Sequence, residues 1–349
     1  MSQYTPETTG EQVAADCQAQ IKNKTVLITG ASPGGLGANF AKVIAKHEPA
    51  SILLATRDLS KAEITAKEIS ELSPKVRVRS IKLDLTSLKQ VRAAADEINS
   101  LNEKIDVIVN NAGIMGPAHS KTVDGIESHF ATNHIGPFLF TNLLLNKQLG
   151  LSSPGKLRVV NISSNGYRLS PIRFEDWNFD DGKTYNRWAA YGQSKTANML
   201  FSRSLAHKLG SRGVTSVSVH PGISQTPLSK DLTMEDFMEI GPLDRAQGHA
   251  SHWGHNVQYK TPSQAVATHV FAAFHPSLDA PGWSLPWLIK SIAAKRQHTD
   301  NILLEYNGAY LAESRPQSDK TVHCWGRDAI DAERLWALSE GIIDQKFDY

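Results

Sequence analysis

Cysteine, an excess of either charge and long apolar runs are all scarce in this sequence of 349 residues. The two cysteines, Cys17 and Cys324, lie far apart and lack metal-ligand spacing, which excludes a disulfide framework and favours a reducing compartment. Lysine plus arginine number 37 and aspartate plus glutamate number 35, so the net charge of +2 gives no electrostatic reason to expect a nucleic-acid partner.

Membrane and metal signals are also weak. Residues 1–20 are polar and lack the apolar core of a signal peptide, and the longest apolar stretch, Phe138–Leu145, is too short to span a bilayer. His252 and His255 have a His-x-x-His spacing without a further ligand, which favours a surface loop over a metal site. We therefore expect a soluble, cytoplasmic protein with no membrane span and no metal.

Short β-branched runs alternate with longer helical patterns from Thr25 to Gly222. Apolar runs bounded by helices are typical of a parallel sheet whose faces are both covered, so we predict an α/β fold with a doubly wound, Rossmann-type sheet. Ser60 followed by Glu63 further predicts a capping box at a helix start. The predicted strands are Thr25–Thr29, Ser51–Thr56, Val76–Leu83, Ile105–Val109, Leu157–Ile162 and Val214–Val219, and the helices between them include Leu36–His47, Ser60–Leu72 and Ser87–Leu101.

The alternation ends after Gly222, where the chain becomes irregular. We predict an N-terminal extension over residues 1–22 and a single domain over 23–349, in which residues 223–300 form a substrate-binding lid. A helix at Pro262–Phe274, a short strand near Gly308–Leu311 and a helix at Ala329–Glu340 complete the chain. Trp253, Trp283 and Trp287 could line an apolar pocket, or equally belong to the core or to a contact between copies in a homo-oligomer.

A glycine-rich loop, Gly30–Gly37, lies between the first predicted strand and the first predicted helix. Glycines at that place allow a tight turn and a close approach to a pyrophosphate, and the helix N-terminus offers N–H groups to the phosphates. The segment Gly30–Gly34 also fits the G-x-S-x-G elbow of hydrolases. That motif uses the N–H of the residue after the serine, and Pro33 has none, so we favour a dinucleotide site.

Arg57 follows the second predicted strand, at a position where enzymes that use NAD commonly have an acidic residue. A guanidinium suits a 2′-phosphate, so the sequence favours NADP(H) over NAD(H). Asp58 beside it could compensate part of its charge.

Two more strand ends carry polar or small residues, namely Asp84-Leu85 and Asn110–Gly113. Because ligands bind at the carboxyl ends of strands in an open parallel sheet, these residues are candidates for the same site. Asp84 taken alone is more typical of an N-cap for the helix that follows it.

Tyr191 and Lys195 lie four residues apart in a helical pattern, so they share a helix face. A nearby lysine favours the phenolate, and we expect it to lower the pKa of Tyr191 for proton exchange with a carbonyl or alcohol oxygen. The strand Leu157–Ile162 ends in Ser163-Ser164, where a hydroxyl could orient a carbonyl group.

These motifs occur together in an order that resembles the short-chain dehydrogenase/reductase family over roughly residues 24–226. The resemblance implies that Tyr191 is the acid/base, that Lys195 tunes its pKa and binds ribose, and that Ser164 orients the carbonyl. Asn133 would hold the water of a proton relay, although from its residue type alone it is more often structural. The cofactor-binding residues implied are Gly30, Ser32, Gly35, Leu36, Gly37, Arg57, Asp84, Leu85, Asn111, Ala112, Gly113, Tyr191, Lys195, Pro221, Gly222, Ile223 and Thr226.

Within the family, Ala55–Asp58, Tyr191–Asn198 and His220–Gly222 are similar to the retinol-dehydrogenase-like and WW-domain-oxidoreductase-like branch. That branch tends to use NADP(H) and lipophilic carbonyls, so we expect a carbonyl reductase or alcohol dehydrogenase acting on a small molecule. The alternative is a non-catalytic protein that senses NADP(H) on the same fold. Such a sensor would not need Tyr191, Lys195 and Ser164 together.

Overall fold

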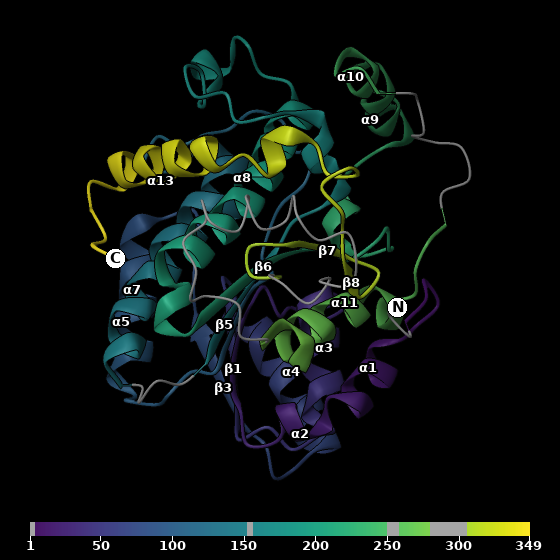
Figure 1. Cartoon of the computed structure of the whole chain (residues 1–349), viewed down its shortest axis with the longest axis vertical. Coiled ribbons are helices and arrows are strands. Elements are labelled where there is room, and N and C mark those ends of the chain that lie inside the picture. Colours follow the sequence, from purple (N-terminus) through teal and green to yellow (C-terminus); the bar gives the residue numbers. More distant parts are fainter. Residues whose placement is uncertain (1–3, 152–155, 250–257, 280–305) are drawn as a thin grey trace, which may run out of the picture.

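A computed structural model describes residues 4–151, 156–249, 258–279 and 306–349 of the chain (Figure 1). Its centre is an eight-stranded sheet in the order β3-β2-β1-β4-β5-β6-β7-β8, in which β8 alone is antiparallel to its neighbour. This arrangement confirms the predicted doubly wound parallel sheet. The strands are β1 Thr25–Thr29, β2 Ser51–Thr56, β3 Arg77–Lys82, β4 Val107–Asn110, β5 Leu157–Ile162, β6 Val214–His220, β7 Tyr310–Ala312 and β8 Arg315–Pro316.

Side chains alternate between the two faces of the sheet, and both faces are buried. In β1, Leu27 faces one apolar core while Val26 and Ile28 face the other. β2 repeats the pattern, since Leu53 joins the first core and Ile52 the second. Burial on both faces explains why the central strands are almost continuously apolar in sequence.

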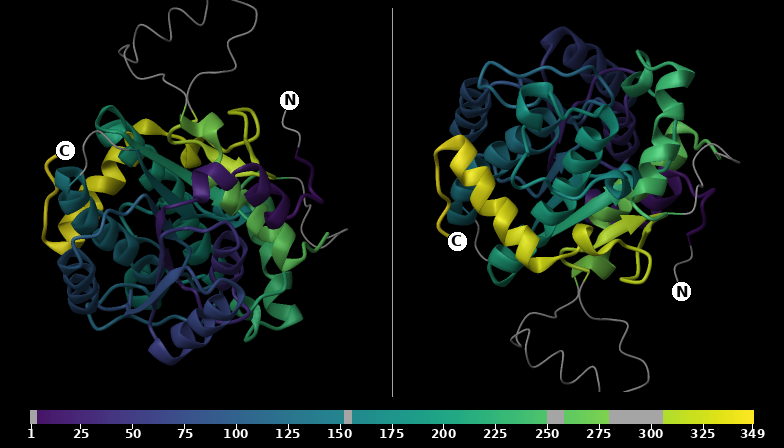
Figure 2. Two further views of the ribbon diagram at one scale, coloured as in Figure 1. Left: turned by 90° about the horizontal axis from the view of Figure 1, so that it is seen from below. Right: turned by 90° about the horizontal axis from the view of Figure 1, so that it is seen from above.

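Helices cover both faces, and two more helices form an outer layer. One face is covered by α3 (Leu36–Ala45), α4 (Leu59–Leu72) and α11 (Pro262–Phe274), and the other by α5 (Leu88–Ser100), α7 (Gly136–Leu151) and α8 (Arg187–Leu209). Helix α13 (Ala329–Ile343) packs on α8, and α1 (Gly10–Asp16) packs on α11 at the other side of the molecule (Figures 1 and 2).

Shorter elements connect these layers. They are α2 (Gln18–Ile21), α6 (Ser128–Phe130), the π-helix η1 (Ala131–Ile135), and α9 (Met234–Met238) and α10 (Ile240–Ala246) after β6, with 3-10 turns at η2 (Asn165–Leu169), η3 (Phe179–Gly182), η4 (Gly210–Arg212), η5 (Pro227–Ser229), η6 (Pro276–Asp279) and η7 (Cys324–Gly326). No helix of the described ranges is both long and apolar enough to cross a membrane. Trp253, Trp283, Trp287, His252 and His255 lie outside the described residues.

Two predicted helix starts are wrong in detail. Asp58, not Ser60, is the N-cap of α4, and its Oδ1 accepts hydrogen bonds from the main-chain N–H and the hydroxyl of Ser60. The N-cap of α5 is Ser87, whereas Asp84 accepts from Thr86 one turn earlier. In both cases an Asp and a Ser lie within three residues of each other, and sequence alone does not decide which of the two becomes the N-cap.

Phe138 tests the core beneath α7 and α13. Its side chain is fully buried and makes an edge contact with Trp336, at 4.9 Å between ring centroids, and a tilted contact with Phe201, at 5.3 Å. We expect Phe138→Ala to lower the free energy of unfolding by about 3–5 kcal/mol, because the cavity cannot collapse completely. Urea unfolding followed by circular dichroism measures this. Val123→Ala, at a side chain that is 86% exposed, is the control and should change stability by less than about 0.5 kcal/mol.

Candidate active site

The sequence-predicted site residues lie at one edge of the sheet, because β1 to β6 are parallel and their carboxyl ends meet there. The loop from Gly30 follows β1, Arg57 follows β2, and Asp84 follows β3. Asn111 follows β4 and Ser163 follows β5. Pro221, Gly222, Ile223 and Thr226 follow β6.

The glycine loop packs closely on the end of β4. Gly30 has a φ of +71°, and a Cβ added there would lie 2.6 Å from the Cα of Ala112. A Cβ on Gly37 would lie 2.5 Å from Asn111 Nδ2. Larger residues at these two positions would push the strand ends apart, so glycine is required for the approach itself.

The N-terminus of α3 is open toward this edge. Its N-cap is Gly35, and no side chain of the described residues caps the first turn. The helices α1, α4, α5, α8, α11 and α13 all have a side-chain cap. Free N–H groups at the positive end of a helix suit a phosphate, and they support the predicted dinucleotide site.

Asn111 and Thr29 fasten the two strand ends together. The amide of Asn111 donates to the carbonyl oxygens of Thr29, at 2.9 Å, and Gly30, at 3.1 Å. The Thr29 hydroxyl accepts from the main-chain N–H groups of Asn111 and Ala112 at 3.0 Å each. This network fixes the crevice between β1 and β4, where the strand order reverses.

Arg57 is exposed at the end of β2 and makes no hydrogen bond or ion pair with any described residue. Asp58 beside it forms no ion pair with Arg57, and its carboxylate caps α4. The free guanidinium stays available to an anionic group of a ligand.

Tyr191 and Ser164 come together, whereas Ser163 turns away. Tyr191 is 5% exposed within α8, and the Ser164 side chain lies close enough to its phenol to lower the pKa of that phenol. The Ser163 hydroxyl donates to the carbonyl oxygen of Lys195 at 2.8 Å, inside the protein. The geometry thus favours Ser164 as the serine that can reach a ligand beside Tyr191.

Lys195 lies near Tyr191 but does not lower its pKa in this structure. Its Nζ donates to the carbonyl oxygen of Ile162 at 3.0 Å and lies 5.6 Å from the centre of the Tyr191 ring. Burial raises the pKa of Tyr191 to about 12, and the adjacent Ser164 side chain opposes only part of that rise. Burial lowers the pKa of Lys195 to about 8. The expected shift of Tyr191 is therefore reversed, because desolvation of the phenolate outweighs the lysine.

Asn133 lies in η1, a π-helix, a distortion that is frequent at functional sites. Its Oδ1 accepts from the N–H of Ile114 at 2.8 Å, and its Nδ2 donates to the Ile114 carbonyl and to the Ser194 hydroxyl. Ser194 in turn donates to the carbonyl oxygen of Tyr191 at 2.7 Å. The side chain therefore joins the loop after β4 to the helix that carries Tyr191.

The remaining predicted residues have local roles in the structure. Leu85 is buried, and its carbonyl oxygen would meet a Cβ on Gly136 at 2.6 Å. Ser32 accepts through its carbonyl from the N–H of Gly35, and Thr226 caps η5. Ile223 forms a bridge to Tyr259. These contacts place them beside the glycine loop or after β6 without joining them to Tyr191.

Sequence reasoning missed two residues at this edge. A Cβ on Gly166 would lie 2.5 Å from Cε1 of Tyr191, so this glycine lets the ring pack against η2. Lys260 lies against Gly222, since a Cβ added to Gly222 would lie 2.6 Å from Cδ of Lys260. Burial lowers the pKa of Lys260. Gly166 follows Ser164 by two residues and could have been suspected, whereas no sequence pattern connects Lys260 with Gly222.

An apolar cluster surrounds the ring of Tyr191. Its buried members come from η2, α8 and α10, and its half-buried members come from the loop after β4 and from the segment after β6. They are Leu169, Trp188 and Ile240, with Met115, Leu232, Phe237 and Leu243. Trp188 Nε1 donates to the carbonyl oxygen of Asp236 at 2.7 Å, so α9 is fixed over this cluster.

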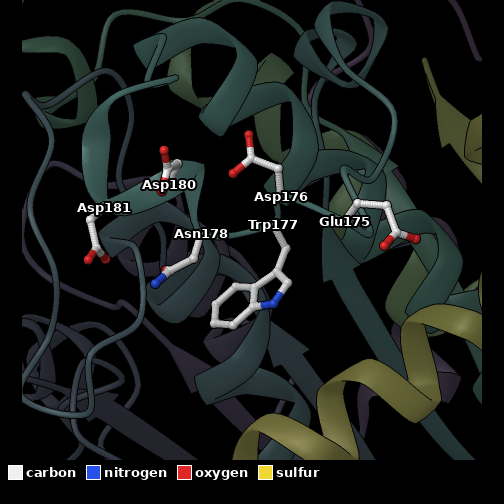
Figure 3. A pocket seen from close by; sticks show the side chains of 6 residues that line it. All are labelled: Glu175, Asp176, Trp177, Asn178, Asp180 and Asp181. Carbon is white, nitrogen blue, oxygen red and sulfur yellow. The ribbon is translucent and has the colours of Figure 1, made fainter.

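A hollow of about 510 Å³ lies elsewhere, on the loop between η2 and α8 (Figure 3). It is lined by Glu175, Asp176, Trp177, Asn178, Asp180 and Asp181. Its four carboxylates spread along the loop in Figure 3, and they pair with Arg334, Arg173, Lys183 and Lys121. None of the predicted site residues lines it. No group of three or more metal-ligating side chains comes together in the described ranges.

Comparisons with known proteins agree with this geometry. The family model described as short chain dehydrogenase matches residues 24–174 and 180–236. The chain is 41% identical to retinol dehydrogenase 13 of Mus musculus over 66% of this chain and 68% of the relative. It is 38% identical to retinol dehydrogenase 11 of Homo sapiens over 74% and 76% of the two chains. A crystal structure of an uncharacterized protein from Mycobacterium Paratuberculosis is similar over 96% of this chain and 98% of that one, with 30% identity and a TM-score of 0.66.

Gly166 offers a test of the packing around Tyr191. We expect Gly166→Ala to destabilise the fold by about 1–3 kcal/mol, because the added methyl group overlaps a buried ring that has little room to move. Gly341→Ala in α13 is the matched control, since nothing lies within 4 Å of its added Cβ. The control should stabilise by about 0.5–1 kcal/mol. Equal urea midpoints for the two variants would contradict the described position of Tyr191.

Proposed function

This chain belongs to the short chain dehydrogenase family, and we propose that it is an NADP(H)-dependent oxidoreductase. It would interconvert a small lipophilic ketone or aldehyde and the corresponding alcohol, in the cytoplasm. The observation that carries the proposal is the position of Tyr191, beside Ser164 and close to Lys195, at the sheet edge where the glycine loop packs on β4.

Several features of this edge fit a dinucleotide. Gly30 and Gly37 keep the crevice open for a close approach, and the uncapped turn of α3 can bind the pyrophosphate. Lys195 Nζ uses one of its donors on Ile162, so the others can reach ribose hydroxyls. The free, exposed Arg57 at the end of β2 supports NADP(H) over NAD(H), because its guanidinium can bind a 2′-phosphate. The bound cofactor would supply or accept the hydride.

The protein's own part in the reaction is proton transfer and positioning. Tyr191 keeps its proton at neutral pH, because burial raises its pKa to about 12, so it is ready to protonate a carbonyl oxygen. Ser164 would donate to the same oxygen and orient it. Lys195, with a pKa of about 8, is mostly charged at neutral pH. It would favour the Tyr191 phenolate that is left after the proton has been transferred. Asn133 would support a proton relay and holds the loop at Ile114 in place.

The surroundings of Tyr191 support a lipophilic substrate. Trp188 of α8 and the residues Leu232, Phe237 and Ile240 of the segment after β6 bring apolar surface to its ring. A binding site of this kind gains affinity by removing apolar ligand surface from water. The similar relatives named retinol dehydrogenases support the same substrate class, since retinol is a lipophilic alcohol.

Arg57 tests the choice of cofactor. We expect the purified protein to bind NADPH more tightly than NADH, as followed by the fluorescence of the reduced nicotinamide. Arg57→Glu should weaken NADPH binding by about 10–100-fold, because a charge-assisted contact becomes a repulsion, and should leave NADH binding nearly unchanged. Arg315→Glu in β8, at the distant edge of the sheet, is the matched control. A wild-type preference for NADH would overturn NADP(H), and no binding of either would overturn the function.

Tyr191 tests the chemistry. Because its pKa is about 12, we expect carbonyl reduction to be nearly constant between about pH 6 and pH 8, whereas alcohol oxidation should rise by up to about tenfold per pH unit. Initial rates with a panel of lipophilic aldehydes and ketones measure this. Tyr191→Phe should lower both rates by about 10²–10⁴-fold, and Tyr349→Phe is the control. Selective NADPH binding without turnover of any substrate would favour the sensor over the enzyme.

A further inference from the structure

A buried pair, Glu127 and His129, lies behind Tyr191 and outside the proposed catalytic group. Both side chains are fully buried, and His129 Nδ1 lies 2.9 Å from Glu127 Oε1. Glu127 also accepts from the N–H groups of His129, at 2.9 Å, and Phe130, at 2.8 Å. Burial alone would raise the pKa of Glu127, but the hydrogen bonds from His129 and the main chain together hold it below its ordinary value. The carboxylate is therefore charged and fully engaged.

The hydrogen bonds of His129 define its tautomer. Its Nε2 lies 2.9 Å from the main-chain nitrogen of Gly116, whose N–H can only donate. Nε2 is therefore the acceptor, and the proton lies on Nδ1, where it is donated to Glu127. Glu127 thus fixes the tautomer that lets His129 accept from Gly116.

The hydrogen bond that His129 accepts from the Gly116 N–H holds one end of the loop after β4. Asn133 holds the other end through both main-chain atoms of Ile114. Between these two anchors lies Met115, which packs in the apolar cluster around Tyr191. Gly116 has a φ of +69°, and a Cβ there would lie 2.7 Å from Cδ2 of Leu232. The loop is therefore clamped between the core and the segment after β6.

The ring of His129 also lies edge-on to Tyr191, with 6.1 Å between the ring centroids. Tyr185 contacts both the loop and His129. Its hydroxyl donates to the carbonyl oxygen of Pro117 at 2.8 Å and lies 3.4 Å from His129 Nδ1. Three side chains thus converge on the loop from residue 113 to 117, two of them from the continuous stretch α6–η1 and the third from the segment before α8. If His129 only filled a cavity, it would not need this set of hydrogen bonds.

We infer that His129, with its tautomer fixed by Glu127, is a positioning residue for the reaction at Tyr191. It binds the loop through the N–H of Gly116 and thereby keeps Met115 in the apolar cluster around the Tyr191 ring. The binding surface next to the ring then keeps its position. This inference rests on the proposed function. It adds that the rate of the hydride step depends on a residue that touches neither cofactor nor substrate.

Two substitutions of His129 separate positioning from packing. In His129→Gln the amide oxygen can accept from Gly116 and the amide nitrogen can donate to Glu127. In His129→Leu the Gly116 N–H and the Glu127 carboxylate both lose a partner. We expect His129→Leu to lower kcat by about 10–100-fold with the affinity for NADPH unchanged within about threefold, and His129→Gln to restore most of the rate. Rates are taken per folded protein, well below each variant's melting temperature.

Of two further readouts, the isotope effect does not respond to a purely structural role, and hydrogen exchange reports the Gly116 hydrogen bond itself. The deuterium isotope effect on kcat, with cofactor labelled at the transferred position, should increase in His129→Leu because hydride transfer becomes limiting. Hydrogen exchange of the Gly116 amide should be at least about tenfold faster in His129→Leu and close to wild type in His129→Gln. An unchanged kcat and isotope effect in folded His129→Leu would overturn the inference, as would equal Gly116 exchange in all three proteins.

Glu127→Gln keeps the experiment decisive if His129→Leu does not fold. A glutamine offers one acceptor oxygen where the carboxylate offers two, so either Phe130 or His129 loses its partner. We expect faster Gly116 exchange and a smaller loss of kcat than in His129→Leu. A wild-type protein that turns over no carbonyl would overturn the proposed function and the kinetic part of this inference. The exchange measurements would still decide whether the clamp exists.

Discussion

The close approach of Gly30 to Ala112 is the constraint on which the rest of the site depends. It brings together the carboxyl ends of β1 and β4, the two strands between which the order of the sheet reverses. Asn111 and Thr29 then hold this contact with four hydrogen bonds, all of them to main-chain atoms. A crevice built from backbone in this way is rigid before any ligand enters it. Binding of a dinucleotide would therefore not carry the free-energy cost of ordering the loop.

Much of the sheet could be predicted from sequence because each central strand is buried on both faces. The bounds of β1, β2 and β5 agree with the prediction, since apolar runs such as Ser51–Thr56 end where Arg57 and Asp58 begin. The N-caps of α4 and α5 were predicted less well, because neighbouring Asp and Ser side chains compete for that position. Such competition is decided by local backbone angles, which composition does not contain.

The proximity of the candidate catalytic residues could be predicted, but their electrostatics could not. Tyr191, Ser164 and Lys195 do meet, as their motifs suggested. The direction of the Tyr191 pKa shift was wrong, because i and i+4 spacing gives proximity and says nothing about how deeply both groups are buried. His129 was not predicted at all. Its partner Gly116 lies 13 residues away, and nothing in their spacing marks a hydrogen bond between a ring nitrogen and a main-chain N–H.

The two outer strands of the sheet affect how copies of the chain can meet. β3 exposes Arg77, Arg79 and Lys82, and both arginines lie 3.6 Å from Glu103. β8 is two residues long and ends in Pro316, which has no N–H to offer a further strand. Charge at one border and a short, proline-ended strand at the other prevent a neighbouring molecule from extending the sheet. Any self-association is thereby directed to the helical faces, and the parallel core is protected from the edge-to-edge pairing that starts β-aggregation.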